Sequence, residues 1–314
     1  MERTNYAFFQ GQFMPLENAN INIMNQTFMY GLGVFEGIRG YWNAEEKCVY
    51  LFRLREHIER MFDSIRIMHL RCEYTVDEVC ELICELVRRN EPTGDIYIRP
   101  SVYCCSNAIS PCLAKSKFDL CILTIPFGDY VDTQAGLRVG VSSWRRVEDN
   151  AIPARAKING CYVNTALAKT DAALAGLDDC IMLSESGHVA EGSAMNLFIV
   201  KKGQLITTST TENILEGITR ATIMEMAERE FGLKSFSRCI DRSELYTADE
   251  MFFCGTGAQV APVAEIDGRP VGNGQFPVTE MIRDKYIALC RGYVAGYEEW
   301  LTKVATQAVV ASAA

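Results

Sequence analysis

The feature that most constrains this fold is the segment Pro126–Gly136, which separates two stretches of patterned sequence. It reads P-F-G-D-Y-V-D-T-Q-A-G, with the proline, glycine and polar content of a connection rather than of a helix or strand. A chain of 314 residues is long enough for two domains. We therefore predict an N-terminal domain over residues 1–125, a connection over 126–136, a C-terminal domain over 137–300 and a disordered tail over 301–314.

The first half alternates short strands with two amphipathic helices. Apolar side chains that recur every three or four residues predict a helix over 53–70. Thr75 and Glu78 form the capping box of a second helix, over 76–90. Strands are predicted at residues 6–13, 20–24, 95–104 and 118–125.

The second half of the chain also alternates predicted strands with predicted helices. A helix follows Thr219 and ends at Gly232, and Asp267–Arg269 marks a hairpin turn. Further helices are predicted at residues 160–175 and 278–300, and strands at 137–142, 179–184, 196–201 and 250–254.

The stretch Ala154–Asn196 holds the residues best suited to chemistry. Lys157 lies among small and apolar residues, whereas most other lysines have polar neighbours. Loss of hydration disfavours the ammonium form of such a lysine, and a neutral amine can form a Schiff base with a carbonyl. A side chain that reaches to the surface is the alternative. Glu191, among small residues, either lies on a surface loop or meets a cation from elsewhere in the chain.

Three other stretches have the composition of binding loops. Gly217–Thr219 precedes a helix, where free N–H groups attract phosphate, although an ordinary helix capped by Thr219 is the alternative. Gly255–Gln259 is a second loop that offers N–H groups to an anion. The glycines of Tyr30–Arg39 indicate either a close backbone approach or a simple hairpin.

Two arginines of the first half have open roles. Arg60 lies off the apolar stripe of its predicted helix, as a solvated arginine would. Tyr97 and Arg99 are two residues apart on a strand and therefore share a face. This pair can bind a carboxylate ligand or an acidic neighbour.

Composition excludes several classes of function. The net charge of −9 argues against nucleic acid or an anionic membrane as a partner. The sequence has no apolar run long enough for a membrane helix and no secretory signal at its start. Thirteen cysteines without a C-x-x-C pair indicate reduced thiols and a cytoplasmic location. The three histidines are widely separated, so we expect no metal site.

Taken together, these stretches resemble the fold-type IV (class IV) pyridoxal-phosphate aminotransferases, and most closely the branched-chain-amino-acid aminotransferases. The resemblance covers about residues 6–290, and its seven blocks occur in family order. They are Y-G-L-G-V-F-E-G-I-R (30–39), R-E-H-I-E-R-M-F-D-S (55–64), Y-I-R-P (97–100), A-K-I-N-G-C-Y-V-N (156–164), E-G-S-A-M-N-L-F (191–198), L-E-G-I-T-R (215–220) and C-G-T-G-A-Q-V-A-P-V (254–263).

The resemblance implies a fold and a cofactor site. The fold would be an α/β (α+β) one, with a smaller N-terminal α/β domain and a larger C-terminal pseudo-barrel domain, as in D-amino-acid aminotransferase. Lys157 would hold pyridoxal 5'-phosphate as a covalent aldimine, and Glu191 would pair with its pyridine nitrogen. Tyr162 would bind the ring 3' oxygen and Leu215 would pack on the ring. The phosphate would be bound by Arg60, Gly217, Ile218, Thr219 and Thr256.

The resemblance also implies a substrate site for leucine, isoleucine or valine and for 2-oxoglutarate. Tyr30, Phe35 and Tyr162 would form an apolar wall. Tyr97, Gly257 and Ala258 would hold the α-carboxylate, and Arg99 with Tyr30 would bind the distal carboxylate of glutamate. The other residue of the substrate set is Arg39. Tyr130 would reach the neighbouring subunit's pocket, which implies a homodimer at minimum and allows a hexamer.

Two departures from the family pattern bear on substrate range. Glu216 stands where many relatives have proline, and Gly257 stands where others have alanine. Alternatives of the same fold type are a D-amino-acid or (R)-amine transaminase and 4-amino-4-deoxychorismate lyase. A binding protein that keeps the fold without turnover is the alternative from another class. Retention of both Lys157 and Glu191 argues against it.

Overall fold

The computed structural model of the protein describes residues 5–128 and 135–305. These residues form two compact units. The first unit comprises residues up to Gly128 together with the short segment Ala156–Gly160 and the chain from Ala288 onward. The second comprises the remainder, up to Arg155 and then Cys161–Ile287.

The first unit is built on one eight-stranded sheet. Its strands follow the order β17-β5-β4-β6-β7-β1-β2, and β3 pairs with β6 beside this path. All of its pairings are antiparallel. The strands are β1 (Tyr6–Phe9), β2 (Gln12–Pro15), β3 (Gly33–Phe35), β4 (Ile38–Asn43), β5 (Cys48–Phe52), β6 (Ile96–Cys104), β7 (Phe118–Pro126) and β17 (Leu301–Ala305).

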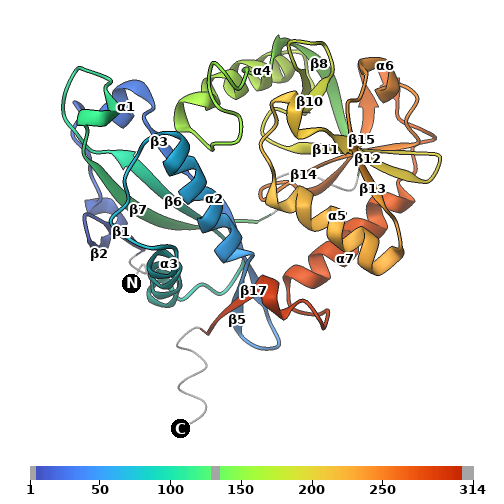
Figure 1. The fold of residues 1–314 in the computed structure, drawn as a ribbon. Coiled ribbons are helices and arrows are strands. Elements are labelled where there is room, and N and C mark those ends of the chain that lie inside the picture. Colours follow the sequence, from blue (N-terminus) through green and yellow to red (C-terminus); the bar gives the residue numbers. More distant parts are fainter. Residues whose placement is uncertain (1–4, 129–134, 306–314) are drawn as a thin grey trace. The chain divides into compact units, whose positions relative to one another are not determined.

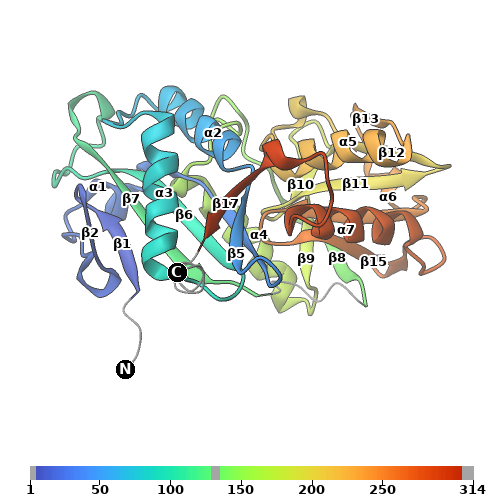
Figure 2. The same ribbon diagram turned by 90° about the horizontal axis from the view of Figure 1, so that it is seen from below.

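Two long helices accompany this sheet, and both follow from local sequence. Helix α2 (Leu54–Ile67) buries the apolar stripe that predicted it. Helix α3 (Val76–Asn90) begins with the predicted capping box, in which Thr75 and Glu78 bond each other's backbone N–H groups. Figure 2 shows α3 lying across β1 and β7. The shorter helical elements of this unit are η1 (Leu16–Asn18), α1 (Gln26–Tyr30), η2 (Leu113–Lys115) and η5 (Glu298–Trp300).

The second unit is built on a nine-stranded sheet that mixes parallel and antiparallel pairs. Its order is β10-β9-β8-β15-β14-β11-β12-β13, and β16 pairs with β15. The pairs β8–β9, β8–β15 and β12–β13 are parallel. The strands are β8 (Leu137–Arg145), β9 (Asp179–Leu183), β10 (Val189–Gly192), β11 (Asn196–Lys201), β12 (Gln204–Thr208), β13 (Ser235–Arg238), β14 (Glu250–Gly255), β15 (Gln259–Ile266) and β16 (Arg269–Pro270).

Helices cover parts of this second sheet. Helix α4 (Tyr162–Leu174) packs on β8 and β9, and α5 (Ile218–Phe231) packs on β13 and β14 (Figure 1). Helix α5 ends at Gly232 in the left-handed conformation, as predicted. No helix of residues 5–128 and 135–305 has the length and apolar character needed to cross a membrane. The remaining elements are η3 (Asn159–Cys161), η4 (Thr210–Glu212), α6 (Arg242–Leu245) and α7 (Pro277–Cys290).

The predicted strand over residues 20–24 is wrong. Ile21 and Ile23 are exposed, and the chain turns at Asn22, whose side chain accepts a hydrogen bond from the N–H of Met24 at 2.8 Å. Asn25 then caps α1. An asparagine that bonds its own nearby backbone favours a turn over a strand. The stretch over 6–13 is likewise two strands, β1 and β2, joined by a turn.

The C-terminal predictions also need correction. The helix predicted over 278–300 ends at Cys290, and Gly292 follows with a positive φ of 79°. The tail predicted from residue 301 begins with a strand instead, because β17 pairs with β5 and buries Val304. The domain boundaries differ in the same region, since the chain from Ala288 onward belongs to the first unit.

Removing β17 should therefore destabilise the protein. A chain ending at Trp300 loses five pairings with β5 and exposes the edge of that strand. Burial of one valine contributes about 1.5 kcal/mol, so we expect the free energy of unfolding to fall by roughly 2 kcal/mol. Urea unfolding of this variant beside one ending at Ala305 measures the difference. Equal stability of the two chains would contradict a stabilising role for β17.

Candidate active site

Lys157 is attached to the first unit by its own backbone. The N–H of Phe35 donates to the Lys157 carbonyl at 3.0 Å, and the N–H of Lys157 donates to Ser64 Oγ at 3.1 Å. Val34 and Ile158 form an isolated antiparallel bridge. The Lys157 amine lies 5.1 Å from the centre of the Phe35 ring. The amine of Lys157 is therefore held beside an aromatic wall of the first unit.

A glycine makes this attachment possible. Gly31 has a φ of 70°, and a Cβ built on it would lie 2.7 Å from Gly160 Cα. The N–H of Gly160 donates to the Gly31 carbonyl at 3.2 Å. Any side chain at position 31 would push the two backbones apart. Of the two alternatives for Tyr30–Arg39, the structure supports a close backbone approach over a simple hairpin, and the segment approached is the one that carries Lys157.

Arg60 is held by a buried carboxylate. Its Nε and Nη2 donate to the two oxygens of Glu36 at 2.7 and 2.8 Å, and His57 Nδ1 lies 2.8 Å from Glu36 Oε2. Burial by itself raises the pKa of the Glu36 carboxyl, but the charge of Arg60 and the hydrogen bond with His57 outweigh it and lower this pKa. An ionised carboxylate only accepts hydrogen bonds, so His57 Nδ1 carries the proton. Arg60 is thus positioned rather than freely solvated.

Arg99 and Tyr97 meet as the strand pattern predicts. Arg99 Nη2 donates to Tyr97 Oη at 2.9 Å. The guanidinium carbon of Arg99 lies 4.5 Å from the centre of the Phe35 ring. These three residues combine an apolar face with a cation and a hydroxyl, which suits a ligand that is apolar in one case and anionic in another.

Three further residues are predicted to contact the substrate, and one of them, Arg39, lies opposite Tyr97 in the pairing of β4 with β6. Arg39 is 2% exposed, and its Nη2 donates to the Gly128 carbonyl at 2.9 Å and lies 3.8 Å from Asp95. Tyr30 ends α1, is 39% exposed and donates to the Ile109 carbonyl at 2.5 Å. Tyr130 falls outside the described residues. The substrate roles of all three stay predictions.

In the second unit, Glu191 is a buried carboxylate with a cation beside it. Arg146 Nε lies 2.8 Å from Glu191 Oε1, and both side chains are more than 90% buried. Arg146 Nε does not meet the geometry of a hydrogen-bond donor toward Glu191 Oε1, so the contact between the two side chains is an ion pair. Burial lowers the pKa of Arg146, but the charge of Glu191 more than compensates and raises it. Of the two readings of Glu191, the structure thus supports the one in which it meets a cation.

Asn196 and Leu215 hold the other oxygen of this carboxylate. Asn196 Nδ2 donates to Glu191 Oε2 and to the Leu215 carbonyl, both at 2.9 Å, and the N–H of Leu215 lies 3.3 Å from Glu191 Oε2. A Cβ at Gly217 would lie 2.0 Å from Asn196 Oδ1. Only glycine therefore fits at position 217 while Asn196 keeps these bonds.

Gly217 is also the N-cap of α5, so the alternative in which Thr219 caps the helix is wrong. Glycine has no side chain with which to accept hydrogen bonds from the first N–H groups of the helix. Ile218 and Thr219 are the first two helical residues, and Thr219 is buried. The first turn of a helix with this kind of cap attracts an anion such as phosphate.

The remaining predicted residues of the second unit lie on two further elements. Tyr162 is the first residue of α4. Thr256, Gly257 and Ala258 form the turn between β14 and β15. Glu216, the residue that replaces proline, makes an exposed ion pair with Arg155 at 2.8 Å. The carboxylate of Glu216 is therefore paired with a residue that lies outside α5.

Sequence reasoning missed the residues that position the others. Arg146 stands next to Arg145 in the sequence, and no local pattern distinguishes the buried arginine from the exposed one. Glu36 and Asn196 both stand inside the family motifs, but the resemblance implies no role for either. An acidic or amide residue among small and apolar ones is the signal that could have found them, because such a group needs a partner when buried.

The family model of class IV aminotransferases matches residues 33–266. The chain belongs to the class IV aminotransferases. Enzymes of this class use pyridoxal phosphate.

Individual relatives of this class IV aminotransferase match it over nearly its whole length. A probable branched-chain-amino-acid aminotransferase of Aquifex aeolicus is 45% identical over 300 residues, which are 95% of this chain and 96% of the relative. The crystal structure of the branched-chain aminotransferase of Thermoproteus uzoniensis with norvaline has a TM-score of 0.92 and 40% identity, covering 96% and 99% of the two chains. That of Thermobaculum terrenum in its pyridoxal-phosphate form has a TM-score of 0.92 and 36% identity, covering 97% and 99%.

The residues of this aminotransferase fit the cofactor of its class. Pyridoxal phosphate presents an aldehyde, a pyridine nitrogen and a phosphate. In the first unit Lys157 offers an amine and Arg60 a guanidinium. In the second unit Glu191 offers a buried carboxylate, and the start of α5 offers N–H groups. Each chemical part of the cofactor thus has a matching group.

Removing the counter-ion of Glu191 should destabilise this aminotransferase strongly. Arg146→Met leaves a buried carboxylate without its cation, which costs about 3–5 kcal/mol. The matched control is Arg145→Met, since the side chain of the exposed Arg145 donates to the carbonyls of Ser184 and Glu185 and, among the described residues, has no ion pair with a carboxylate. Denaturant unfolding of both variants measures the loss. Losses of equal size would show that the Arg146–Glu191 ion pair has no special weight.

Proposed function

We propose that this protein transfers the amino group of branched-chain L-amino acids (leucine, isoleucine and valine) to 2-oxoglutarate, giving branched 2-oxo acids and L-glutamate. The observation that carries the proposal is the cluster of Arg99, Tyr97 and Phe35. Arg99 donates to the Tyr97 hydroxyl at 2.9 Å and lies 4.5 Å from the Phe35 ring centre. Such a cluster serves an aliphatic and a dicarboxylic substrate in turn.

When bound, pyridoxal phosphate withdraws electrons from the Cα of the amino acid and carries the amino group between the two substrates. Lys157 holds the cofactor through its Nζ and moves a proton to and from the substrate Cα. Support comes from the backbone bonds of Lys157 to Phe35 and Ser64, which fix where its side chain begins. An amine that transfers a proton must be held in one position relative to the substrate, and a fixed backbone helps to hold it there.

Glu191 supplies the negative charge for the pyridine nitrogen. Its two oxygens are oriented by Arg146 on one side and by Asn196 on the other, so the carboxylate does not rotate freely. A carboxylate opposite the ring nitrogen keeps that nitrogen protonated and favours electron withdrawal from Cα. Leu215, in the segment before α5, would pack its apolar side chain on the ring, and Tyr162 would bind the 3' oxygen.

Arg60, Gly217, Ile218, Thr219 and Thr256 bind the phosphate. The bonds between Arg60 and Glu36 hold the guanidinium in one orientation, and the start of α5 presents backbone N–H groups. A fixed cation and fixed dipoles bind an anion with little ordering cost. Tyr97 with the turn residues Gly257 and Ala258 binds the substrate α-carboxylate, while Tyr30 and Arg39 complete the substrate set.

We place the enzyme in the cytoplasm as a homodimer at minimum. All thirteen cysteines lie in the described part of the chain, where none forms a disulfide, which supports a reducing compartment. A hexamer built from such dimers is the alternative assembly.

A substrate panel tests the function. The purified holoenzyme is assayed with 2-oxoglutarate and L-leucine, D-alanine or (R)-1-phenylethylamine as amino donor, and glutamate formation is measured. We expect L-leucine to give the highest kcat/KM. Lys157→Ala, as a control, should abolish turnover with every donor while cofactor binding stays measurable. A preference for D-alanine or the (R)-amine would replace the proposal by the corresponding transaminase of the same fold type.

A single substitution tests how one site accepts both substrates. Arg99→Ala removes the cation that faces the distal carboxylate, and hydrogen bonds to a charged group contribute about 1.5–3 kcal/mol. We therefore expect KM for glutamate and 2-oxoglutarate to rise about 10–100-fold and KM for leucine to change little. Arg66→Ala, at an arginine whose side chain is 82% exposed, is the matched control. Equal losses for leucine and glutamate would rule out dual recognition by Arg99.

A further inference from the structure

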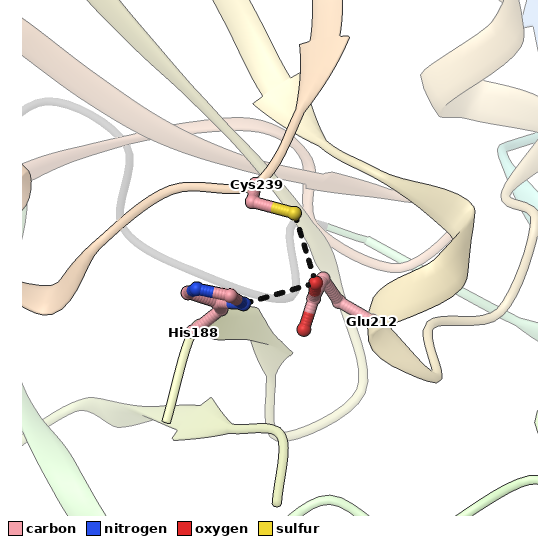
Figure 3. A group of neighbouring side chains, drawn as sticks. All are labelled: His188, Glu212 and Cys239. Carbon is pink, nitrogen blue, oxygen red and sulfur yellow. Dashed lines mark hydrogen bonds and ion pairs between the residues drawn. The ribbon is translucent and has the colours of Figure 1, made fainter. Parts of the chain in front are cut away.

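A second group of chemically reactive side chains lies in the second unit, apart from the residues assigned above. His188 immediately precedes β10, Glu212 is the last residue of η4, and Cys239 follows β13. Figure 3 shows the three side chains converging, with Glu212 between the imidazole and the thiol. Among the residues that the structure describes, this is the one group of three or more potential metal ligands whose ligand atoms all lie within 4.8 Å of one another.

Two of the separations between these ligand atoms are close to those of a coordination polyhedron. His188 Nδ1 lies 3.2 Å from Glu212 Oε1, and Cys239 Sγ lies 3.1 Å from the same oxygen. Zinc bonds of about 2.0–2.3 Å in a tetrahedron separate neighbouring ligand atoms by about 3.3–3.6 Å. An ion can therefore enter with shifts of a few tenths of an ångström at the two measured edges.

The chemical types of the three ligand atoms indicate which metal ion the site prefers. One thiol sulfur, one imidazole nitrogen and one carboxylate oxygen are ligands that Zn²⁺ accepts together. Mg²⁺ and Ca²⁺ require mainly oxygen ligands and would leave the sulfur unused. Three protein ligands leave one tetrahedral position for water.

Neighbouring side chains surround two of the three ligands, Glu212 and His188. Ser184 Oγ and Ser186 Oγ donate to Glu212 Oε2 at 2.6 and 3.3 Å, so the other oxygen, Oε1, faces His188 and Cys239. His188 Nε2 lies 3.8 Å from a carboxylate oxygen of Asp241. A carboxylate behind the distal imidazole nitrogen is the usual outer partner of a histidine that binds zinc. Ser186 Oγ also lies 3.1 Å from His188 Nδ1 and can yield this place to an ion.

Backbone hydrogen bonds tie the three segments together before any ion arrives. The N–H of Ser184 donates to the His188 carbonyl at 2.8 Å, and the N–H of Val189 donates to the Ile240 carbonyl at 2.8 Å. The N–H of Ser209 donates to the Arg238 carbonyl at 3.0 Å. Little ordering of the backbone is therefore needed when the ligands close on a metal.

We propose that His188 Nδ1, Glu212 Oε1 and Cys239 Sγ bind one Zn²⁺ ion, with water as the fourth ligand. The thiol of Cys239 loses its proton to solvent as the ion binds. The sequence indicated no metal site because the three ligands are distant along the chain and come together only in the folded second unit. The competing explanation is a plain hydrogen-bond network that satisfies the buried Glu212.

The position of the ion suggests a structural role. His188 leads within three residues to Glu191, and Glu212 leads within three residues to Leu215, whose N–H lies 3.3 Å from Glu191 Oε2. An ion bound to both His188 and Glu212 therefore links the two segments that meet at Glu191. Zinc should stabilise this part of the second unit.

The test uses the untagged, full-length holoenzyme, freed of metals by a chelator and then dialysed against ZnCl2. Bound zinc is counted by mass spectrometry, the Kd is measured by competition with a chromophoric chelator, and thermal unfolding is followed with and without zinc. We expect one zinc per chain and a rise in Tm on zinc binding. Co²⁺ in place of zinc should give a sulfur-to-cobalt charge-transfer band.

Cys239→Ser distinguishes the two explanations, because a serine hydroxyl can still donate to Glu212 but is a poor zinc ligand. We expect this variant to keep its zinc-free Tm and to bind zinc at least about 100-fold more weakly, a larger loss than outer-shell changes cause. It should also lack the cobalt band. Cys112→Ser, at an exposed cysteine of the first unit, is the matched control and should behave like the parent.

Two results would overturn the proposal. One is a holoenzyme that binds no stoichiometric zinc. The other is a Cys239→Ser variant whose zinc affinity equals that of Cys112→Ser, which would assign the binding to thiols elsewhere. Both readouts are independent of transamination, so neither the success nor the failure of the proposed function affects them.

Discussion

The second unit depends on how one buried carboxylate is neutralised. Glu191 is 4% exposed, and an isolated charge at such a depth would cost several kcal/mol. Arg146 offsets this cost from the residue after β8, and Asn196 and the N–H of Leu215 hold the opposite oxygen. These contacts join β10, the start of β11 and the loop before α5 at one point. The backbone around Glu191 is thereby fixed relative to the first turn of α5.

The first unit also contains a buried carboxylate paired with an arginine. There the carboxylate, Glu36, orients the cation, Arg60, that is suited to the cofactor. Glu36 is fully buried and binds Arg60 through both of its oxygens, while the protonated Nδ1 of His57 completes its hydrogen bonds. Close packing of Gly31 on Gly160 places the Lys157 segment on this same unit. In each unit, a polar group suited to the cofactor is oriented by buried partners that do not themselves react.

A third buried carboxylate, Glu212, has partners of a different kind. Its partners are two serines, an imidazole and a thiol rather than an arginine. Hydrogen bonds alone can satisfy such a carboxylate, but a nitrogen and a sulfur on the same oxygen also form a ligand set for a divalent cation. Glu191 and Glu36 each have an arginine partner, whereas Glu212 has none among these contacts. This difference supports a metal-binding role for Glu212 over a purely structural one.

The sequence by itself determined what depends on near neighbours in the chain. The capping box of α3, the end of α5 at Gly232, the hairpin turn at Asp267 and the shared face of Tyr97 and Arg99 were all predicted correctly. The motifs around Lys157 and Glu191 also indicated the family. Each of these signals lies within a few residues, where helical and strand periods and caps act.

Only the tertiary structure decided which distant groups meet. It distinguished Arg146 from Arg145, gave Glu36 and Asn196 their partners and paired β17 with β5. It also brought His188, Glu212 and Cys239 together. The physical reason is that charge pairing, strand addition and ligand clustering join residues far apart along the chain. Their energies depend on burial and distance in the folded unit, neither of which is present in a local pattern of residue types.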